Sequence, residues 1–214
     1  MGVDGQVRNR AIFLDRDGVL NHAIVREGKP YPPSSIDEFI IFPGLAERLA
    51  RIKEKGFFLI VVTNQPDVAR GKITHKIVNA FNRLLREQLP IDHVLVCFHD
   101  DSDKCDCRKP LPGLLHQAQE RFNLDLDHSY MVGDRWRDIG AGTAAGCTTV
   151  FVDYGYNEEF KSKKADYSCQ SPSDALDWIL AKESHYLPIR RSSLPGVPFR
   201  KSHRKTPQGK EVYP

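Results

Sequence analysis

The 214-residue sequence contains few cysteines and no long apolar segment. Its five cysteines are an odd number and do not suggest the paired disulfide framework of a small secreted domain. No apolar run approaches the ~18 residues that a membrane-spanning helix needs, and the N-terminus lacks the basic segment and apolar segment of an export signal. We therefore expect a soluble, cytoplasmic protein with no membrane partner.

The net charge of +3 is small but unevenly distributed. Residues 184–214 hold seven Lys or Arg and one acidic residue, so this tail carries +6 and the rest of the chain −3. The tail is rich in Pro and Ser and is expected to be largely disordered. We expect one domain over residues 8–183 and a basic tail over 184–214. Basic tails bind nucleic acid or acidic surfaces in some proteins, but a solvated extension without a partner is the favoured interpretation.

Short apolar runs alternate with segments of helical periodicity along the domain. This order predicts an α/β fold, a doubly wound, Rossmann-like parallel sheet with helices on both faces. Thr74 is expected to cap the second helix, and segment 22–35 is expected to be a loop, with no large cap domain. The expected strands are 11–14, 57–62, 94–96, 130–132 and 149–152, and the expected helices are 45–55, 74–89, 111–122, 137–145 and 173–182.

Two aspartates spaced by one residue, Asp15 and Asp17, end the first apolar run, and Gly18 follows at once. At the carboxyl end of a parallel strand, such side chains project toward the crevice where these sheets bind ligands. One carboxylate then serves as a nucleophile and the other as a proton donor, with a hard cation between phosphate and protein. Taken alone, the pair also fits solvated loop aspartates, but three later segments favour the catalytic interpretation.

These three segments lie near the ends of later strands or the starts of helices. Thr63-Asn64-Gln65 supplies a hydroxyl and amides that donate hydrogen bonds to phosphate oxygens. Lys109 precedes a helix and is suited to neutralise a phosphoryl group together with the nucleophilic carboxylate. Asp134 follows a strand and suits magnesium, whereas Asp138 either supports that site or caps the next helix.

Three cysteines and a histidine fall within eleven residues, namely Cys97, His99, Cys105 and Cys107. This Cys3His set has the number and type of ligands that structural zinc prefers. With no open coordination position, the metal is expected to hold in place the loop that carries Arg108 and Lys109. Arg108 is also suited to bind a distal anionic group of a substrate.

The motifs occur in the order of those of the haloacid dehalogenase superfamily. They are Asp15-x-Asp17-Gly18, Thr63-Asn64, Lys109 and Gly133-Asp134-x-x-x-Asp138. The chain resembles in particular the small-cap branch that contains heptose bisphosphate phosphatases and histidinol-phosphate phosphatases. The passage Cys105-Asp106-Cys107-Arg108-Lys109-Pro110 strengthens this resemblance. It covers residues about 8 to 182 and leaves out the tail.

The resemblance implies a magnesium-dependent phosphatase that works through an aspartyl phosphate. Asp15 would be the nucleophile, and Asp17 would protonate the leaving alcohol and then deprotonate water. Magnesium would bind Asp15, the backbone carbonyl of Asp17, and Asp134. The phosphate- and substrate-binding residues would be Thr63, Asn64, Arg108, Lys109 and Arg135, and the zinc cluster also occurs in the relatives.

The implied substrate is a small sugar phosphate, with heptose 1,7-bisphosphate as the first candidate and histidinol phosphate as the second. The sequence departs from the heptose bisphosphatases at substrate-side positions, with Pro66-Asp67 where those enzymes usually have Ser-Gly. Arg135 likewise stands where they commonly have Lys. A monomer is expected. From another functional class, the alternative is a binding protein that acts through its basic tail.

Overall fold

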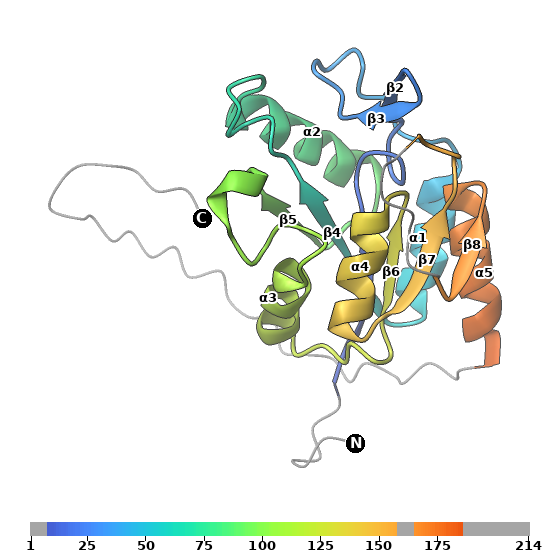
Figure 1. Ribbon diagram of the computed structural model, residues 1–214. Helices are drawn as coiled ribbons and strands as arrows, with labels where there is room; N and C mark the ends of the chain where they lie inside the picture. The colour runs from blue at the N-terminus through green and yellow to red at the C-terminus, as the bar shows by residue number, and fades with distance from the viewer. Residues whose placement is uncertain (1–7, 158–164, 186–214) are drawn as a thin grey trace, which may run out of the picture.

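The computed structural model describes residues 8–157 and 165–185, and among these residues six parallel strands form the central sheet (Figure 1). Their order across the sheet is β5-β4-β1-β6-β7-β8. The bounds are Arg10–Leu14 (β1), Phe57–Asn64 (β4), His93–Cys97 (β5), Tyr130–Gly133 (β6), Thr148–Val152 (β7) and Tyr167–Cys169 (β8). The predicted α/β fold with a doubly wound parallel sheet is confirmed.

The strand order reverses its direction at β1, which pairs in parallel with β4 on one side and β6 on the other. Ligands of open α/β sheets bind in the crevice at the carboxyl ends of the strands on either side of such a switch point. The register pairs Leu14 with Val61 and with Val132. The segments that follow β1, β4 and β6 therefore meet at one edge of the sheet.

Helices cover both faces of the sheet, and each face has its own apolar core. The buried side chains of α1 (Leu45–Glu54), α2 (His75–Gln88) and α5 (Pro172–Lys182) pack on one face. Those of α3 (Gly113–Phe122) and α4 (Trp136–Ala145) pack on the other, the face toward the viewer in Figure 1. Strand residues point alternately to the two faces, so Ile12 and Leu14 belong to the first core, and Ala11 and Phe13 to the second.

The expected helices are confirmed, with small differences at their ends. Thr74 caps α2, since its hydroxyl accepts a hydrogen bond from the Ile77 amide at 3.4 Å. The helix expected from residue 111 begins only at Gly113, after Pro112. The preceding residues belong instead to the loop that carries Lys109.

Two features of the fold were missed in the sequence. The segment expected to be a loop holds an antiparallel hairpin, β2 (Ile24–Arg26) and β3 (Lys29–Tyr31), which lies above the carboxyl edge of the sheet (Figure 1). Its two-residue turn, Glu27-Gly28, has positive φ at both positions, as a type I′ turn requires, but lacks the usual Asn-Gly or Asp-Gly signal. Strand β8 has only three residues, too few to show a period of two.

The boundary predicted between domain and tail stays a prediction, because most of the predicted tail, residues 186–214, lies outside the described residues. The same holds for the tail's expected disorder. Among the described residues, no helix has the length and apolar character needed to cross a membrane.

Candidate active site

The predicted catalytic side chains come together at the switch point of the sheet. Asp15 follows β1, Thr63 lies near the end of β4, and Asp134 follows β6. All three line a cavity of about 420 Å³, together with Asp17 and Lys109. The hairpin β2–β3 forms part of the opposite wall, through residues 29–31. The cavity is thus closed on one side by the sheet edge and on the other by the hairpin.

Lys109 is the most constrained residue of the site. Its side chain is buried, and its ammonium group donates to the Val62 carbonyl at 2.7 Å and contacts Asp15 Oδ1 at 2.9 Å and Asp138 Oδ1 at 2.5 Å. These contacts use all three donors of the ammonium group. Despite the burial, the two carboxylates raise the pKa of Lys109. Lys109 is therefore a fixed positive charge next to Asp15.

The side chain of Asn64 holds the backbone of Lys109 in place. Its Nδ2 donates to the Lys109 carbonyl at 3.0 Å, and its Oδ1 accepts from the Lys109 amide at 3.1 Å. This pair of hydrogen bonds joins the end of β4 to the loop that precedes α3. Asn64 therefore positions Lys109, and its contact with phosphate stays a prediction.

Asp138 caps the start of α4, one of the two roles that the sequence left open, and it also contacts Lys109. Its Oδ1 contacts Lys109, and its Oδ2 accepts from the Arg135 amide at 3.0 Å in the first turn of α4. An Asp at this position of a helix satisfies a backbone donor that would otherwise lack a partner. The residue thus connects the start of α4 to the site.

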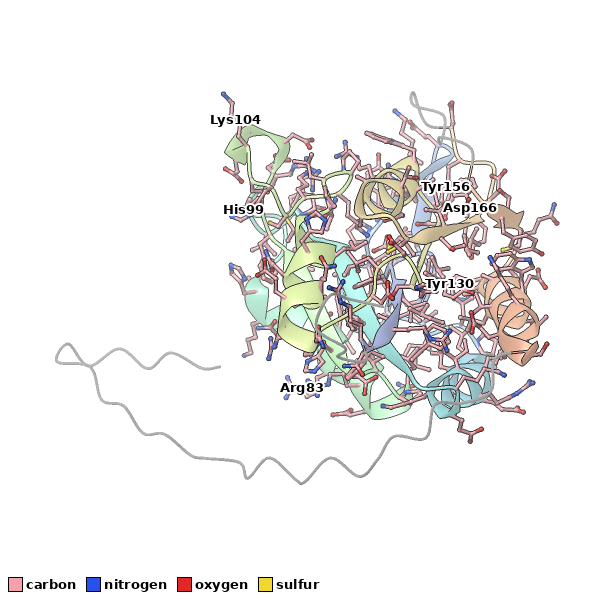
Figure 2. The ribbon with its side chains drawn as sticks, turned by 90° about the horizontal axis from the view of Figure 1, so that it is seen from below. Arg83, His99, Lys104, Tyr130, Tyr156 and Asp166 are labelled. Carbon is pink, nitrogen blue, oxygen red and sulfur yellow. The ribbon has the colours of Figure 1, made fainter. Side chains whose placement is uncertain are left out.

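Asp134 is buried, and among the described residues no donor forms a hydrogen bond of normal geometry with either of its carboxylate oxygens. The phenol of Tyr156, labelled in Figure 2, lies near enough to affect the pKa of this carboxyl group. Burial, and then the charges of Asp15 and Asp138, raise the pKa of Asp134 well above its ordinary value. A Cβ atom at Gly18 would lie only 1.9 Å from Asp134 Oδ2. Glycine is thus required where the backbone approaches this carboxylate.

The carboxylates of Asp15, Asp134 and Asp138 lie within 4.8 Å of one another. Burial raises the pKa of Asp15 to about 6, with Asp138 adding to the shift and Lys109 opposing it. A hard divalent cation that binds oxygen ligands would remove the repulsion and bind the oxygens of Asp134, which have no well-formed hydrogen bond within residues 8–157 and 165–185. Asp15 and Asp134 therefore fit the magnesium site predicted from the sequence, whereas Asp138 was expected only to support that site and the side chain of Asp17 is not in this group.

Asp17 is held by Arg16 and Asn21, which the sequence analysis did not assign to the site, and by Gln65, which it did. Its Oδ1 accepts from Arg16 Nε at 3.2 Å and from Asn21 at 2.9 Å. Its Oδ2 accepts from Arg16 Nη2 at 2.9 Å and from Gln65 at 2.8 Å. Gln65 was expected to face phosphate, and the described structure instead directs its amide to Asp17 and to the Thr63 hydroxyl. The sequence contained a signal for the contact between Gln65 and Thr63, because alternate residues of a strand lie on the same side.

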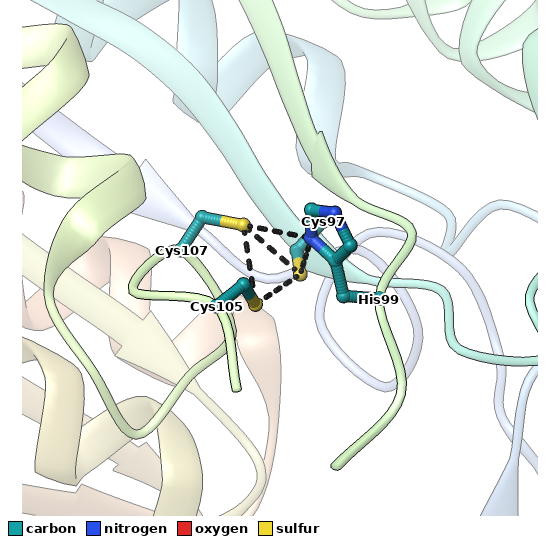
Figure 3. A group of neighbouring side chains, drawn as sticks. All are labelled: Cys97, His99, Cys105 and Cys107. Atoms are coloured by element: carbon teal, nitrogen blue, oxygen red, sulfur yellow. Dashed lines mark hydrogen bonds between the residues drawn. The ribbon is translucent and has the colours of Figure 1, made fainter. Parts of the chain in front are cut away.

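The predicted metal-binding cluster is formed by residues from the end of β5 and the loop that follows it (Figure 3). The contacts between sulfur and nitrogen atoms of Cys97, His99, Cys105 and Cys107 range from 3.2 to 3.7 Å. A tetrahedron with metal–sulfur bonds of about 2.3 Å has edges of about 3.8 Å. Burial and the neighbouring thiols raise the pKa of Cys107, a penalty that a bound cation removes. The four side chains therefore fit a closed tetrahedral metal site.

The loop held by this cluster also carries acidic residues that bind arginines. His99 and Lys104 mark its position in Figure 2. Asp101 Oδ1 contacts both Arg108 Nε at 2.8 Å and Arg137 at 3.2 Å. Arg137 lies on α4, so one carboxylate oxygen brings together two guanidinium groups from different parts of the chain.

Arg70 forms salt bridges with Asp100 and Asp67. Arg70 and Arg135 both line the cavity. No spacing rule pointed to Asp101 or Arg137, because their contact joins segments 36 residues apart.

Comparisons with known proteins agree with this geometry. The family model described as HAD-hydrolase-like matches residues 106–175. A D-glycero-beta-D-manno-heptose-1,7-bisphosphate 7-phosphatase of Yersinia pestis is 39% identical over 185 residues, covering 79% of this chain and 89% of its own. The enzyme of the same name from Pasteurella multocida is 37% identical over 181 residues, covering 77% of this chain and 94% of its own.

A solved structure gives the same result. The D,D-heptose 1,7-bisphosphate phosphatase of B. bronchiseptica, crystallised with magnesium and phosphate, superposes with a TM-score of 0.69 at 30% identity. The alignment covers 81% of this chain and 99% of that one. Similarity at this identity, over nearly the whole length of the relatives, shows that the chain belongs to the haloacid dehalogenase-like hydrolases and is a phosphatase of that family.

Proposed function

We propose that this phosphatase hydrolyses a sugar bisphosphate, D-glycero-β-D-manno-heptose 1,7-bisphosphate, through an aspartyl phosphate on Asp15. In the first step, an Asp15 carboxylate oxygen forms a bond to phosphorus while the bond to the leaving oxygen breaks. Asp17 gives its proton to that oxygen, so that a neutral alcohol departs. The contact between Lys109 and Asp15 supports this assignment, because it provides a fixed positive charge where the transferred group gains negative charge.

The second step releases phosphate. Asp17 takes a proton from water, the water oxygen bonds to phosphorus, and the bond to Asp15 breaks. The hydroxyl of Thr63 is buried and lines the cavity, which suits a hydrogen bond to a phosphoryl oxygen. Mg²⁺, held by Asp15, Asp134 and the Asp17 carbonyl, would supply charge neutralisation at the phosphoryl group.

Zinc at Cys97, His99, Cys105 and Cys107 has a structural role in this proposal. Four protein ligands leave no position for substrate or for an activated water. Bound zinc would hold Arg108 and Lys109 in place, because these residues follow the ligand Cys107 directly in the sequence.

The observation that carries the choice of substrate is the pairing of Arg108 and Arg137 on Asp101 at the cavity wall. Each guanidinium has five N–H donors, so both retain donors for a second phosphate. Apart from Lys109 and the four aspartates of the reaction centre, Asp15, Asp17, Asp134 and Asp138, the cavity lining contains two carboxylates, Asp67 and Asp101, and six cationic side chains, Lys29, Arg70, Lys72, Arg108, Arg135 and Arg137. This excess of positive charge favours a second anionic group over the ammonium group of histidinol phosphate. The names of the relatives support the same choice.

Phosphate release from the two candidate substrates tests the proposal. We expect the heptose bisphosphate to give a kcat/KM at least tenfold higher than histidinol phosphate, with the heptose 1-phosphate as product. A preference for histidinol phosphate would establish the other substrate. Activity that disappears when residues 184–214 are removed would favour a function that depends on the tail.

Arg108→Ala is expected to raise KM for the bisphosphate roughly 10- to 100-fold, the effect of losing one charge-assisted hydrogen bond. For heptose 7-phosphate, which lacks the distal phosphate, KM should stay within about threefold. Arg83→Ala is the matched control, because it removes the same charge from an exposed residue far from His99 and the metal-binding loop (Figure 2). Equal effects of Arg108→Ala on both substrates would contradict the role in binding a second phosphate.

Cys105→Ser is expected to lower zinc content and thermal stability together, because a closed metal site contributes to folding. The variant should bind substrate more weakly, since Arg108 and Lys109 lose their fixed loop. The folded fraction should still form the aspartyl phosphate. Melting temperature, zinc content and phosphoenzyme yield are measured on one preparation, with Cys169→Ser as the control outside the cluster. A stable, zinc-loaded but inactive variant would indicate a catalytic metal instead.

A further inference from the structure

The side chain of Arg16 is fully buried, yet its position between Asp15 and Asp17 gives it no part in the chemistry described so far. Its guanidinium lies beside two aromatic rings, 5.7 Å from the ring centre of Phe39 and 5.3 Å from that of Phe81. These two rings stack on each other at 4.6 Å. The arginine therefore has a rigid, water-free environment in which its few polar contacts are strong.

Those polar contacts are directed at Asp17. Nε and Nη2 reach the two oxygens of the Asp17 carboxylate, at 3.2 and 2.9 Å, and Nη1 donates to Asn82 Oδ1 at 3.3 Å. Two parallel contacts from a planar guanidinium fix both the position and the plane of a carboxylate, which a single donor does not. The backbone amide of Arg16 also donates to Asp15 Oδ1 at 2.7 Å. One residue thus contacts both aspartates.

Two buried side-chain amides also contact Asp17, and their orientation is unfavourable for their own carbonyl oxygens. Asn21 and Gln65 each direct a side-chain NH2 group to Asp17, and the carbonyl oxygens of the same side chains have no hydrogen-bond partner among the described residues. Buried acceptors without donors are destabilising. The NH2 groups of the two side chains also donate to the His22 carbonyl and the Thr63 hydroxyl, so these acceptors and Asp17 together set the orientation of the two amides. Asp17 receives four hydrogen bonds at a carboxylate that has about four lone-pair sites.

The geometry points to Arg16 as a positioning residue for the proton donor: its buried guanidinium holds the Asp17 carboxylate in the place and plane that serve the leaving oxygen. The inference rests on the aspartyl-phosphate mechanism proposed above. When the bond from phosphorus to the leaving oxygen breaks, its electron pair stays on that oxygen, and the proton arrives from Asp17. Asp17 must give up one of its four donors to reach that oxygen, and the Arg16 Nε contact is the longest of them. Nη2 then keeps the carboxylate in place.

Two aryl phosphates separate this role from a purely structural one. Phenyl phosphate releases a phenolate, whose conjugate acid has a pKa of about 10, and its departure benefits from a proton. 4-Nitrophenyl phosphate releases a stabilised anion that needs no proton. Rapid-quench measurement of aspartyl-phosphate formation by the Mg²⁺-loaded full chain reports this step alone, and neither substrate depends on the choice of sugar.

Arg16→Met is expected to slow phosphoenzyme formation from phenyl phosphate about 10- to 100-fold, a part of the usual contribution of general acid catalysis. With 4-nitrophenyl phosphate the rate should change by less than about threefold. Arg16→Lys should give an intermediate loss, because one ammonium cannot span both oxygens of Asp17. Asp17→Asn supplies the reference pattern. Asn82→Ala, which removes the other partner of the guanidinium, should resemble the wild type with both substrates.

Equal slowing with both aryl phosphates would overturn the inference, because a loosened fold affects both reactions alike. If Arg16→Met does not fold, as a melting curve would reveal, Arg16→Lys retains the buried stem and charge and provides the same comparison. A wild-type enzyme that forms no phosphoenzyme from either substrate would contradict the proposed mechanism itself. If the wild type forms the phosphoenzyme and the Arg16 variants are slowed equally with both aryl phosphates, only the role of Arg16 is contradicted.

Discussion

Asp15→Asn is expected to abolish turnover, because an amide cannot form the acyl phosphate on which both steps depend. The substitution is nearly isosteric, and the Lys109 ammonium keeps its other two partners, Val62 and Asp138. The loss should therefore appear in kcat and in the phosphoenzyme, which becomes undetectable by acid quench. Phosphate release is measured with an excess of Mg²⁺ over a range of substrate concentrations.

The control is Asp37→Asn, the same substitution at an exposed residue outside the cavity. It should retain wild-type kcat and KM. Wild-type turnover in Asp15→Asn would contradict the nucleophile assignment. A large loss in Asp37→Asn would instead point to a general sensitivity of the fold to loss of carboxylates.

Asp134→Asn is expected to lose activity and to make the metal-free protein more stable. Burial raises the pKa of Asp134 above its ordinary value of 3.8 in the folded state, whereas the unfolded chain ionises at that value. The metal-free fold therefore loses stability as pH rises from the unfolded pKa toward the folded one. Replacement by a neutral amide removes this loss, so the variant should melt a few degrees above the wild type at pH 7, roughly 2–4 °C for each kcal/mol. The difference should disappear toward pH 4.

Magnesium should make the wild type, rather than Asp134→Asn, the protein with the higher melting temperature. EDTA is expected to abolish wild-type activity and excess Mg²⁺ to restore it, because such sites keep several waters and exchange readily. Added Mg²⁺ should raise the melting temperature of the wild type but not of Asp134→Asn. Melting curves with and without Mg²⁺, between pH 4 and 8, test both statements. A metal-free variant that melts below the wild type at pH 7 would show that the Asp134 carboxylate stabilises the fold on its own.

The local features of the site could be predicted because each depends on a short stretch of sequence. A strand followed by Asp15 and Asp17 is recognisable within eight residues, and the cysteine cluster within eleven. The fold class followed similarly from alternating apolar periodicities. The hairpin β2–β3 could not be predicted, because Pro30 and the Glu27-Gly28 turn depart from the usual strand and hairpin signals.

The contacts that give these residues their chemical properties depend on segments that are distant in the sequence. The salt bridge between Lys109 and Asp138 and the contact of Arg137 with Asp101 are long-range, and no periodicity encodes them. The two-donor contact of Arg16 with Asp17 joins neighbours, but it requires the aromatic environment supplied by Phe39 and by α2.

Short stretches of sequence were enough to name the groups that take part: the paired aspartates, the lysine, the cysteines of the proposed metal site and the strands that bring them to one edge. Only the tertiary structure decided what each group does there. It directed Asn64 to the backbone of Lys109 rather than leaving its amide open to the cavity, and it buried Asp134 with no well-formed hydrogen bond to its oxygens from the part of the chain that the structure describes. The physical reason is that residue types and local periodicity are properties of short segments, whereas burial, charge and hydrogen-bond partners depend on which distant segments pack together.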